Sequence, residues 1–474
     1  MVGSAVDAVV VGSGPNGLAA AVEIARAGRS VVVLEQQPML GGGTHSDALT
    51  LPGFVHDVCA AVHPLLLASP FFQRLPLDQH GLRLIQPPTP LAHPFDDGSV
   101  ATLERSLDET CARLGADGLA YRRLFGPLVA RWRGLVNDLL GPLRPPRSPG
   151  ALAWFGAWAL LPSSLLARAL FRDQPARGLV AGLAAHSNLP LERPLTSAFA
   201  LVLGTLGHAV GWPIVEGGSQ RIADALHAYL VRLGGQTLVD RPVETLRDLP
   251  MHRAALFDVS PRQLVHIAGR ALPATYRSRL ERYRYGPGAF KVDWALDAPV
   301  PWRASACRRA ATVHLGGSLE EVAASERAAW QGQHPRRPFV LLVQASLFDP
   351  TRAPPGKHTV WAYCHVPHAS VEDMTDRVEA QIERFAPGFR NRVVARSVLR
   401  PTDLQRRNAN MIGGVIGGGV QDLAQHFTRP LPRRVPYTTP NPRLFLCSSS
   451  TPPGAGVHGM CGFFAARAAL ERVL

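Results

Sequence analysis

Four residues near the start of the sequence have the types and the spacing that bind a dinucleotide. Gly12, Gly14 and Gly17 form the pattern G-x-G-x-x-G, and Glu35 follows after an apolar run. In this pattern the first glycine permits a tight turn, the second lets a pyrophosphate approach the backbone, and the third lets a helix pack closely on a strand. An acidic residue placed like Glu35 accepts hydrogen bonds from a ribose. These residues predict a dinucleotide site.

The elements that must position these residues are a strand, a turn, a helix and a second strand. A β-branched run precedes Gly12, an alanine-rich amphipathic stretch follows it, and a second β-branched run ends at Glu35. Together they predict a βαβ unit over residues 9–36. The N-terminus of its helix would supply amide donors and a positive dipole to the phosphates.

Two further glycine-rich segments favour FAD over a nicotinamide dinucleotide. Gly41, Gly42 and Gly43 make a second turn directly after the second strand, where a simple nicotinamide site needs none. The segment "STPPGAGVHGMCGFFAARAAL" near the C-terminal end is a third glycine loop, and it opens a helix. The positive end of that helix would stabilise negative charge on a reduced isoalloxazine ring.

The chain resembles the phytoene dehydrogenase-related FAD-dependent oxidoreductases, relatives of carotenoid isomerase within the wider amine oxidase-like FAD superfamily. Beyond the glycine motif and Glu35, the resemblance lies in "LPGFVHD", "WPIVEGGSQRIADAL", "RPVETL" and "PPGAGVHGMCG". It covers essentially the whole length, and it is thin between residues 105 and 205. It implies noncovalent FAD, with the backbone of Val243 at the adenine and with Gly456 and Val457 beside the isoalloxazine ring.

The predicted fold class is α/β, with a discontinuous Rossmann-like FAD-binding domain and an inserted α+β substrate domain. Dinucleotide-type pieces at the start, middle and end predict residues 1–85, 205–275 and 430–474 for the first domain, and 86–204 and 276–429 for the second. No metal site is predicted. The predicted cofactor-binding residues are Gly12, Ser13, Gly14, Asn16, Gly17, Glu35, Gln36, Gly42, Gly43, Thr44, Val243, Gly456 and Val457.

Lysine is nearly absent from the sequence, which contains only Lys291 and Lys357 against 48 arginines. The segment "YRYGPGAFKVDWALDAPVPW" resembles the amine oxidase-type strand whose lysine holds a water against flavin N5. The resemblance makes Lys291 the predicted catalytic residue, as a cation or as an amine neutralised by burial. The alternative is a lysine at a strand end that extends to solvent. Pro452, Pro453 and Gly454 stand where amine oxidases place aromatic side chains, which disfavours an amine substrate.

Other candidate chemistry in the sequence is weaker. The chain has no second G-x-G-x-x-G and no C-x-x-C, unlike the pyridine nucleotide-disulfide reductases. The run "MIGGVIGGGVQDL" at 411–423 follows no convincing strand, so a loop near the flavin is favoured over a nicotinamide site. Histidines beside the motifs are either hydrogen-bonded structural groups, which we favour, or bases. They are His45, His56, His63, His208 and His458.

The composition narrows the partners and the compartment. The net charge of +14 comes from arginines scattered singly or in short pairs, so it favours a solvated surface over nucleic-acid binding. The six cysteines lack metal-ligand spacing and indicate free thiols in a reducing compartment. The cytoplasm is the expected location. Residues 148–167 carry no charge and predict either a pocket-covering helix pair or a patch that contacts a membrane surface.

Local patterns predict the remaining elements. Residues 84–103 are expected to be extended, with a turn at Asp96 to Gly98, and residues 107–171 to be helical with proline breaks. We also expect a strand over "QTLVDRPVETL" and a helix over 371–385.

Three functions fit these observations. The leading one is an FAD-dependent dehydrogenase or desaturase that transfers a hydride from an apolar, isoprenoid- or polyketide-like substrate to flavin N5. Its electrons would leave to dioxygen, a quinone or another acceptor. The second is a flavin-dependent isomerase that moves double bonds without net redox chemistry. The third is a non-catalytic, flavin-bearing interaction or regulatory protein. The sequence leaves the oligomeric state open.

Overall fold

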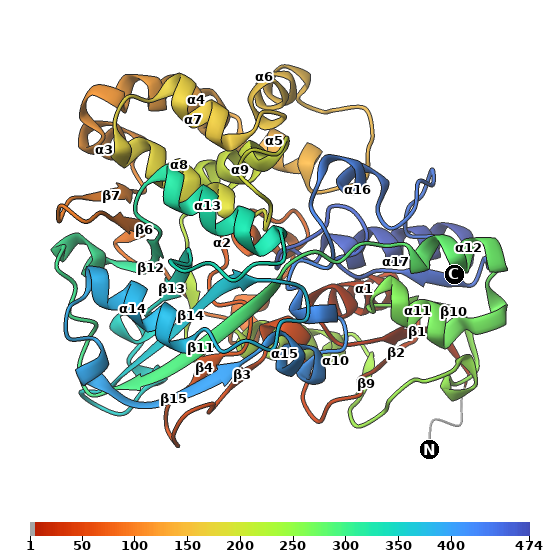
Figure 1. Ribbon diagram of the computed structural model, residues 1–474. Coiled ribbons are helices and arrows are strands. Elements are labelled where there is room, and N and C mark those ends of the chain that lie inside the picture. Colours follow the sequence, from red (N-terminus) through yellow and green to blue (C-terminus); the bar gives the residue numbers. More distant parts are fainter. Residues whose placement is uncertain (1–4) are drawn as a thin grey trace.

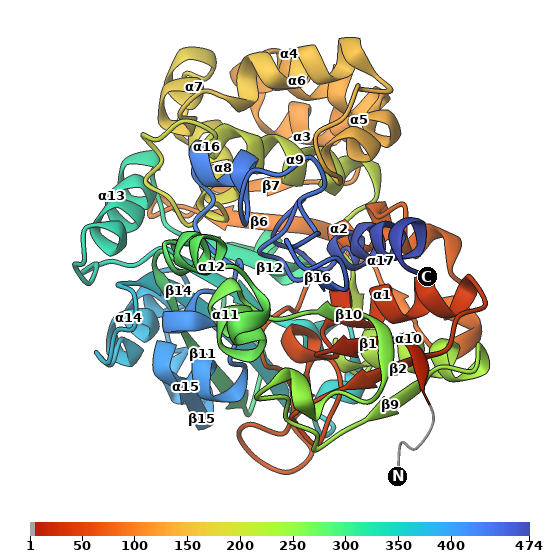
Figure 2. The same ribbon diagram turned by 90° about the vertical axis from the view of Figure 1, so that its right-hand side faces the viewer.

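The computed structural model describes residues 5–474, which form two β-sheets and a layer of helices (Figure 1). The smaller sheet lies at the right of Figure 1, the larger sheet at the lower left, and the helical layer at the upper left. Figure 2 turns the smaller sheet and its helices toward the viewer. This arrangement is the predicted α/β fold with a Rossmann-like domain.

The smaller sheet has five parallel strands in the order β16-β10-β1-β2-β9. Its strands come from three distant parts of the chain, all inside the segments expected to form the cofactor domain, while the domain boundaries themselves stay a prediction. The strands are β1 (Val6–Val11), β2 (Val31–Leu34), β9 (Gln236–Leu238), β10 (His252–Phe257) and β16 (Leu444–Leu446).

Both faces of this sheet are covered, as expected for parallel strands with continuous apolar runs. In β1, Ala8 and Val10 pack on one side, and Val9 and Val11 pack on the other. Helix α17 packs so closely on the start of α1 that a side chain at Gly462 would collide with the Asn16 carbonyl. The helices of the first side are α1 (Pro15–Arg26), α10 (Gln220–Arg232) and α17 (Met460–Arg472); those of the second are α11 (Pro261–Ala268) and α12 (Ala274–Glu281).

The larger sheet has seven strands in the order β15-β11-β14-β13-β12-β6-β7, and only its β12–β6 pair is parallel within the described residues. Strand β11 alternates strictly, so Phe290, Val292 and Trp294 pack in one core while Lys291 and Asp293 point to the opposite face. The strands are β6 (Thr89–Pro94), β7 (Val100–Leu103), β11 (Gly288–Leu296), β12 (Ala310–Leu315), β13 (Val340–Val343), β14 (His358–Val366) and β15 (Val393–Leu399).

The helical layer confirms the prediction for residues 107–171. Helices α6 and α7 meet at 96° at the Pro162 break, and Phe155 is buried while Trp154 is partly exposed. In the part of the chain that is described, no single helix could cross a membrane, although this bent pair together has the necessary length and composition. Contact with a membrane stays a prediction. The layer contains α3 (Leu107–Arg113), α4 (Gly118–Ala130), α5 (Trp132–Leu139), α6 (Pro149–Ala159), α7 (Ser163–Leu170), α8 (Gln174–Ala185), α9 (Thr196–Ala209) and α13 (Leu319–Trp330).

The strand predicted over "QTLVDRPVETL" is wrong beyond Leu238. Asp240 has a φ of 51°, and Pro242 has no N–H to donate to a sheet. The chain instead bonds to the segment after β2, with Arg241 N donating to the Glu35 carbonyl over 2.8 Å. This loop brings Val243 toward the carboxyl ends of β1 and β2.

The remaining elements include a short hairpin, β3 and β4, that lies against β14. The turn expected near Asp96 and the helix expected over 371–385 are both present. These elements are β3 (Ser46–Asp47), β4 (His56–Asp57), β5 (Leu84–Ile85), β8 (Ile214–Val215), α2 (Pro64–Ala68), α14 (Thr375–Phe385), α15 (Pro401–Arg407) and α16 (Leu423–Thr428).

Candidate functional site

A cavity of about 500 Å³ opens at the carboxyl ends of β1, β2 and β10. Open α/β sheets bind their ligands at this edge, and the volume is typical of a site for a small molecule or a cofactor. Its walls come from the glycine turn after β1, the residues after β2 and β10, the loop over 407–418, and the third glycine loop. The structure therefore brings all three glycine-rich segments to one place.

Eleven of the thirteen predicted cofactor residues line this cavity. The two that do not are Gly17 and Thr44. The Gly17 N–H donates to the Asp258 carboxylate over 2.9 Å, and the Thr44 hydroxyl donates to the Gly41 carbonyl over 2.9 Å. Both residues hold the turns in shape. That the eleven lining residues contact a cofactor stays a prediction.

The glycine turn is built for close approach by a ligand. A side chain at Gly14 would lie 2.6 Å from the Asp258 carboxylate, and one at Gly42 would lie 3.1 Å from the Gly14 Cα. No side chain caps the N-terminus of α1, and its first turn carries no acidic residue. Pro15 has no amide and the Gly17 amide already donates to the Asp258 carboxylate, so the Asn16 amide is the first-turn donor that could meet a phosphate in the cavity.

Glu35 organises the glycine turn. Its carboxylate accepts hydrogen bonds from the Ser13 amide over 2.9 Å, the Ser13 hydroxyl over 2.6 Å and the Gln37 amide over 2.9 Å. On the same cavity wall, the buried Asn16 Oδ1 has no hydrogen-bond partner among residues 5–474 and remains available to a ligand. Hydrogen bonding of Glu35 to a ribose stays a prediction.

Asp258 is a site residue that sequence reasoning missed. It follows β10, and burial raises the pKa of its carboxyl to about 7; the Gly17 amide opposes this rise, and the charge of Glu35 adds to it. Asn410 donates to the Asp258 carbonyl over 2.8 Å and so ties the 407–418 loop to the cavity. The available signal was an acidic residue ending an apolar strand directly before the helix start "SPRQL".

The glycine-rich run at 411–423 forms a 3₁₀ turn and a loop beside the cavity. Met411, Val415 and Ile416 give this wall an apolar surface. No strand of the described structure leads into this run, so it lacks the strand–turn–helix context of a dinucleotide fingerprint.

Lys291 lies in the middle of β11 and is only 2% exposed, which excludes a lysine that extends to solvent. Its amino group pairs with the Asp293 carboxylate and lies 5.7 Å from the centre of the Trp361 ring. Burial lowers the pKa of Lys291, while Asp293 opposes that shift. Lys291 does not line the cavity itself. Cys59 does, and it is near enough to Lys291 for their charges to interact.

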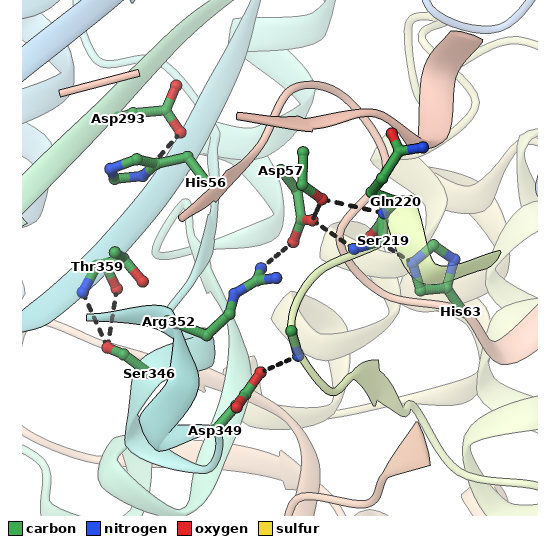
Figure 3. A network of polar contacts seen from close by, with 12 residues as sticks. His56, Asp57, His63, Ser219, Gln220, Asp293, Ser346, Asp349, Arg352 and Thr359 are labelled. Carbon is green, nitrogen blue, oxygen red and sulfur yellow. Dashed lines mark hydrogen bonds and ion pairs between the residues drawn. The ribbon is translucent and has the colours of Figure 1, made fainter. Parts of the chain in front are cut away.

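Figure 3 shows a second buried ion pair, which Arg352 forms with Asp57, and the charge of Asp57 is near enough to act on Lys291. Arg352 pairs with Asp57, which also accepts from the Ser219 amide over 2.7 Å and from the Ser46 hydroxyl over 2.7 Å. Burial alone would raise the pKa of Asp57, but Arg352 and these hydrogen bonds hold it below its ordinary value. The pair joins the β3–β4 hairpin to the segment before β14, and the bond from Ser219 adds the segment before α10.

The histidines near the motifs have different surroundings. Among the five, only His45 lines the cavity, and burial lowers its pKa. Burial lowers the pKa of His63, His208 and His458 to about 4, and each has a hydrogen-bond partner. These three are neutral near pH 7, as structural histidines would be. His56 hydrogen-bonds to Thr50 over 2.8 Å.

Comparison with known proteins agrees with this geometry. The model of the NAD(P)-binding Rossmann-like domain matches residues 10–75. The chain is 27% identical to pyridine nucleotide-disulfide oxidoreductase domain-containing protein 2 of Mus musculus, over 96% of this chain and 92% of the relative. It is 34% identical to hydroxyneurosporene desaturase of Cereibacter sphaeroides over 46% of each chain, and 23% identical to 4,4'-diapolycopene oxygenase of Methylomonas sp over 95% and 94%.

The fold is shared with solved flavin oxidases. A putrescine oxidase with putrescine bound superposes with a TM-score of 0.63 at 16% identity, over 99% of both chains. An identity this low shows the fold and nothing finer. The sequence relatives include a desaturase and an oxygenase, and the cavity has the glycine turns of a dinucleotide site. The chain is therefore an oxidoreductase that is similar in sequence to hydroxyneurosporene desaturase and 4,4'-diapolycopene oxygenase and that shares the fold of putrescine oxidase.

Proposed function

We propose that this chain is an FAD-dependent dehydrogenase that desaturates an apolar substrate. The observation that carries the proposal is the single cavity in which three glycine-rich turns meet an apolar wall formed by Met411, Val415 and Ile416. The turns fit a long dinucleotide, and the wall fits a substrate without charge. The sequence relatives that act on carotenoids support the same substrate class.

The residues of the cavity fit FAD along its length. The Asn16 amide at the start of α1 would bind the pyrophosphate, Glu35 the adenosine ribose, and the Val243 backbone the adenine. Gly456 and Val457 lie on the wall formed by the third glycine loop, where the isoalloxazine ring would lie. The unpartnered Asn16 Oδ1 and the glycine positions that admit no side chain both favour a large polar ligand here.

When bound, FAD supplies a hydride acceptor at N5. The chain's own residues would then orient the substrate and exclude water. Met411, Ile416 and Val457 present apolar surface to an extended hydrocarbon. Dehydrogenation of a C–C bond also releases one proton, which a protein group must accept. Burial lowers the pKa of Lys291 and so favours its neutral amine form. We propose that this amine accepts the proton.

Anaerobic spectroscopy of the purified protein tests this function. We expect a yellow protein whose flavin band bleaches when an isoprenoid or polyketide-like substrate is added without air, with one desaturated product per flavin reduced. A colourless protein that takes up no FAD would overturn the proposal. So would a flavin that no apolar candidate reduces.

The same experiment separates desaturation from isomerisation. An isomerase would turn over with pre-reduced flavin and would need no stoichiometric acceptor. A desaturase would stop after one turnover until an acceptor is supplied. The anaerobic product yield therefore decides between the two.

A further inference from the structure

A row of buried polar side chains leads from the cavity side of β11 toward the surface. Its members in order are Lys291, Asp293, His56 and Thr50. They come from the larger sheet and from the β3–β4 hairpin, which lies between that sheet and the cofactor cavity. No single sequence motif contains them, because β11 and the hairpin are more than 200 residues apart.

The first step joins Lys291 to Asp293. The period of two along β11 puts both side chains on the same face, and the amino group donates to the Asp293 carboxylate. Asp293 is fully buried, so its negative charge has no water to stabilise it. The ammonium form of Lys291 compensates that charge, and a neutral amine leaves the carboxylate without its charge partner.

The second step joins Asp293 to His56 (Figure 3). The Oδ1 atom of Asp293 lies 3.4 Å from the Nδ1 atom of His56, with both side chains fully buried. Neither atom has a hydrogen-bond partner in the described structure. If His56 donates from Nε2, its Nδ1 is unprotonated, and a proton arriving on Asp293 would bridge the two atoms. The gap is thus arranged to take up one proton.

The third step joins His56 to the surface. Its Nε2 hydrogen-bonds to the Thr50 hydroxyl over 2.8 Å, and Thr50 is only half-buried. Pro52 and Gly53, which follow in the chain, are exposed. A proton that enters His56 at Nδ1 can therefore leave from Nε2 through the Thr50 hydroxyl to solvent.

Several other groups face Lys291 and set its charge balance. Cys59 and Asp57 approach it from the hairpin side, and Asp57 is already neutralised by Arg352. From β14, Tyr363 stands opposite it in the sheet and Trp361 offers its ring face. Among these groups, Asp293 is the one that contacts His56.

We propose that Asp293 and His56 are positioning residues that carry a proton between the Lys291 amino group and solvent at Thr50. The proposal rests on the proposed dehydrogenation. Desaturation breaks two C–H bonds on adjacent carbons: one hydrogen leaves with its electron pair to the flavin, and the other leaves as a proton. The neutral amine of Lys291 accepts that proton through a water beside Cys59, Asp293 takes it from the ammonium, and His56 passes it to Thr50 and bulk water. Each release restores the neutral amine.

The scarcity of lysine makes this path directly measurable. Protein labelled with ¹⁵N at the lysine Nζ gives two amine signals, and Lys357→Arg assigns them. At pH values below the pKa of Lys291, its buried ammonium group should exchange protons with solvent quickly, because the path is open. In His56→Gln and in Thr50→Val we expect that exchange to slow at least tenfold. The Lys357 signal serves as an internal standard in the same sample.

A matched control is His365→Gln, which removes a buried histidine from the larger sheet, the sheet that carries Lys291. His365 bonds instead to Glu326 over 2.7 Å, so its loss should leave Lys291 exchange unchanged. Equal exchange in wild type and His56→Gln would overturn the path, even if the protein desaturates its substrate. Slowed exchange in a protein that never reduces its flavin would instead overturn the proposed function and keep the path.

The rate of flavin reduction and its solvent deuterium isotope effect give a second readout. Substrate-linked flavin reduction in His56→Gln should slow relative to wild type, and its solvent deuterium isotope effect should increase. FAD retention should be unchanged, because His56 does not line the cavity. An unchanged isotope effect in His56→Gln would contradict the path independently of the exchange data.

Discussion

The two ends of the site are built from different materials. At the end where we propose that a nucleotide binds, the nucleotide end, Gly12, Gly14 and Gly42 leave space beside the backbone, and the ligand would supply the charge. At the Lys291 end, ionisable side chains fill the space, and each has a partner of the opposite type, as in the Asp57–Arg352 and Lys291–Asp293 pairs. The first end therefore depends on glycine positions that carry no side chain, and the second depends on paired side chains. Substitutions should break the two ends in different ways.

Gly17→Ala should have the largest effect. Its new methyl group would collide with the Gly12 carbonyl oxygen, which is backbone and cannot swing away. We expect the free energy of unfolding to fall by about 4–5 kcal/mol, the upper end for one substitution, and the flavin to be lost. Urea unfolding and the flavin absorbance measure both. In Gly156→Ala, a control in α6 with no atom near the new methyl group, stability should stay equal or rise by up to about 1 kcal/mol.

Asp57→Asn should have the next largest effect, and it tests the charged end. Asparagine keeps an acceptor for the Ser219 amide but leaves Arg352 as a buried charge without its partner. We expect a loss of about 3–5 kcal/mol in urea unfolding. Arg168→Met breaks the exposed pair with Glu320 and should cost less than about 1 kcal/mol. Similar losses in both variants would show that burial of the pair does not matter.

Glu35→Gln tests whether Glu35 binds the ribose of FAD or only holds the glycine turn in shape. The substitution removes the negative charge that accepts the hydrogen bonds from the Ser13 and Gln37 amides. The weaker bonds should lower the free energy of unfolding by about 1–2 kcal/mol. If Glu35 also binds the adenosine ribose, FAD affinity should fall about tenfold while FMN affinity, which involves no adenosine, stays near that of wild type. Fluorescence titration of the apoprotein with both flavins measures the difference. Equal losses for the two flavins would place the whole effect in the turn.

Asp258→Asn should have the smallest effect of the four at low pH, and an effect that grows as the pH rises. The folded carboxyl has a pKa of about 7 and the unfolded one about 3.8, so between these values the folded state binds more protons. Wild-type stability therefore falls as pH rises through this window, by about 1.4 kcal/mol per unit at most. The variant lacks this decline, so urea unfolding should favour it over wild type by at least about 1 kcal/mol at pH 8, with a smaller difference at pH 5. A constant difference would contradict the raised pKa.

The nucleotide end could be predicted from the sequence, because a backbone-built site leaves a local signature. Gly12, Gly14 and Gly17 lie within six residues, and the strand and helix that hold them are adjacent in the chain. The turn formed by Gly41 to Gly43 is also local. Patterns of this kind identify residues by their spacing in the sequence. Eleven of the thirteen residues predicted in this way line one cavity.

The Lys291 end could be predicted only in part. The rarity of lysine singled out Lys291, but its partners lie on other segments and their side chains carry no spacing signal. His56 was noted beside a motif without its contact to Asp293, because only the folded hairpin brings the two together. Asp258 was missed for the same reason. The strand over "QTLVDRPVETL" was wrong because its β-branched residues suggested a sheet that Pro242 and the φ of Asp240 prevent.

The smaller sheet interleaves early and late parts of the chain, and this order constrains synthesis. A polypeptide still emerging from the ribosome presents the α1 turn long before β16 and the Gly456 loop exist. Until translation passes that loop, the cavity lacks one of its walls, and Asn16 lacks the α17 backbone that packs on it. If the cavity binds the flavin as we propose, cofactor capture follows synthesis of residues 444–472, and a nascent chain stalled before them would emerge without flavin.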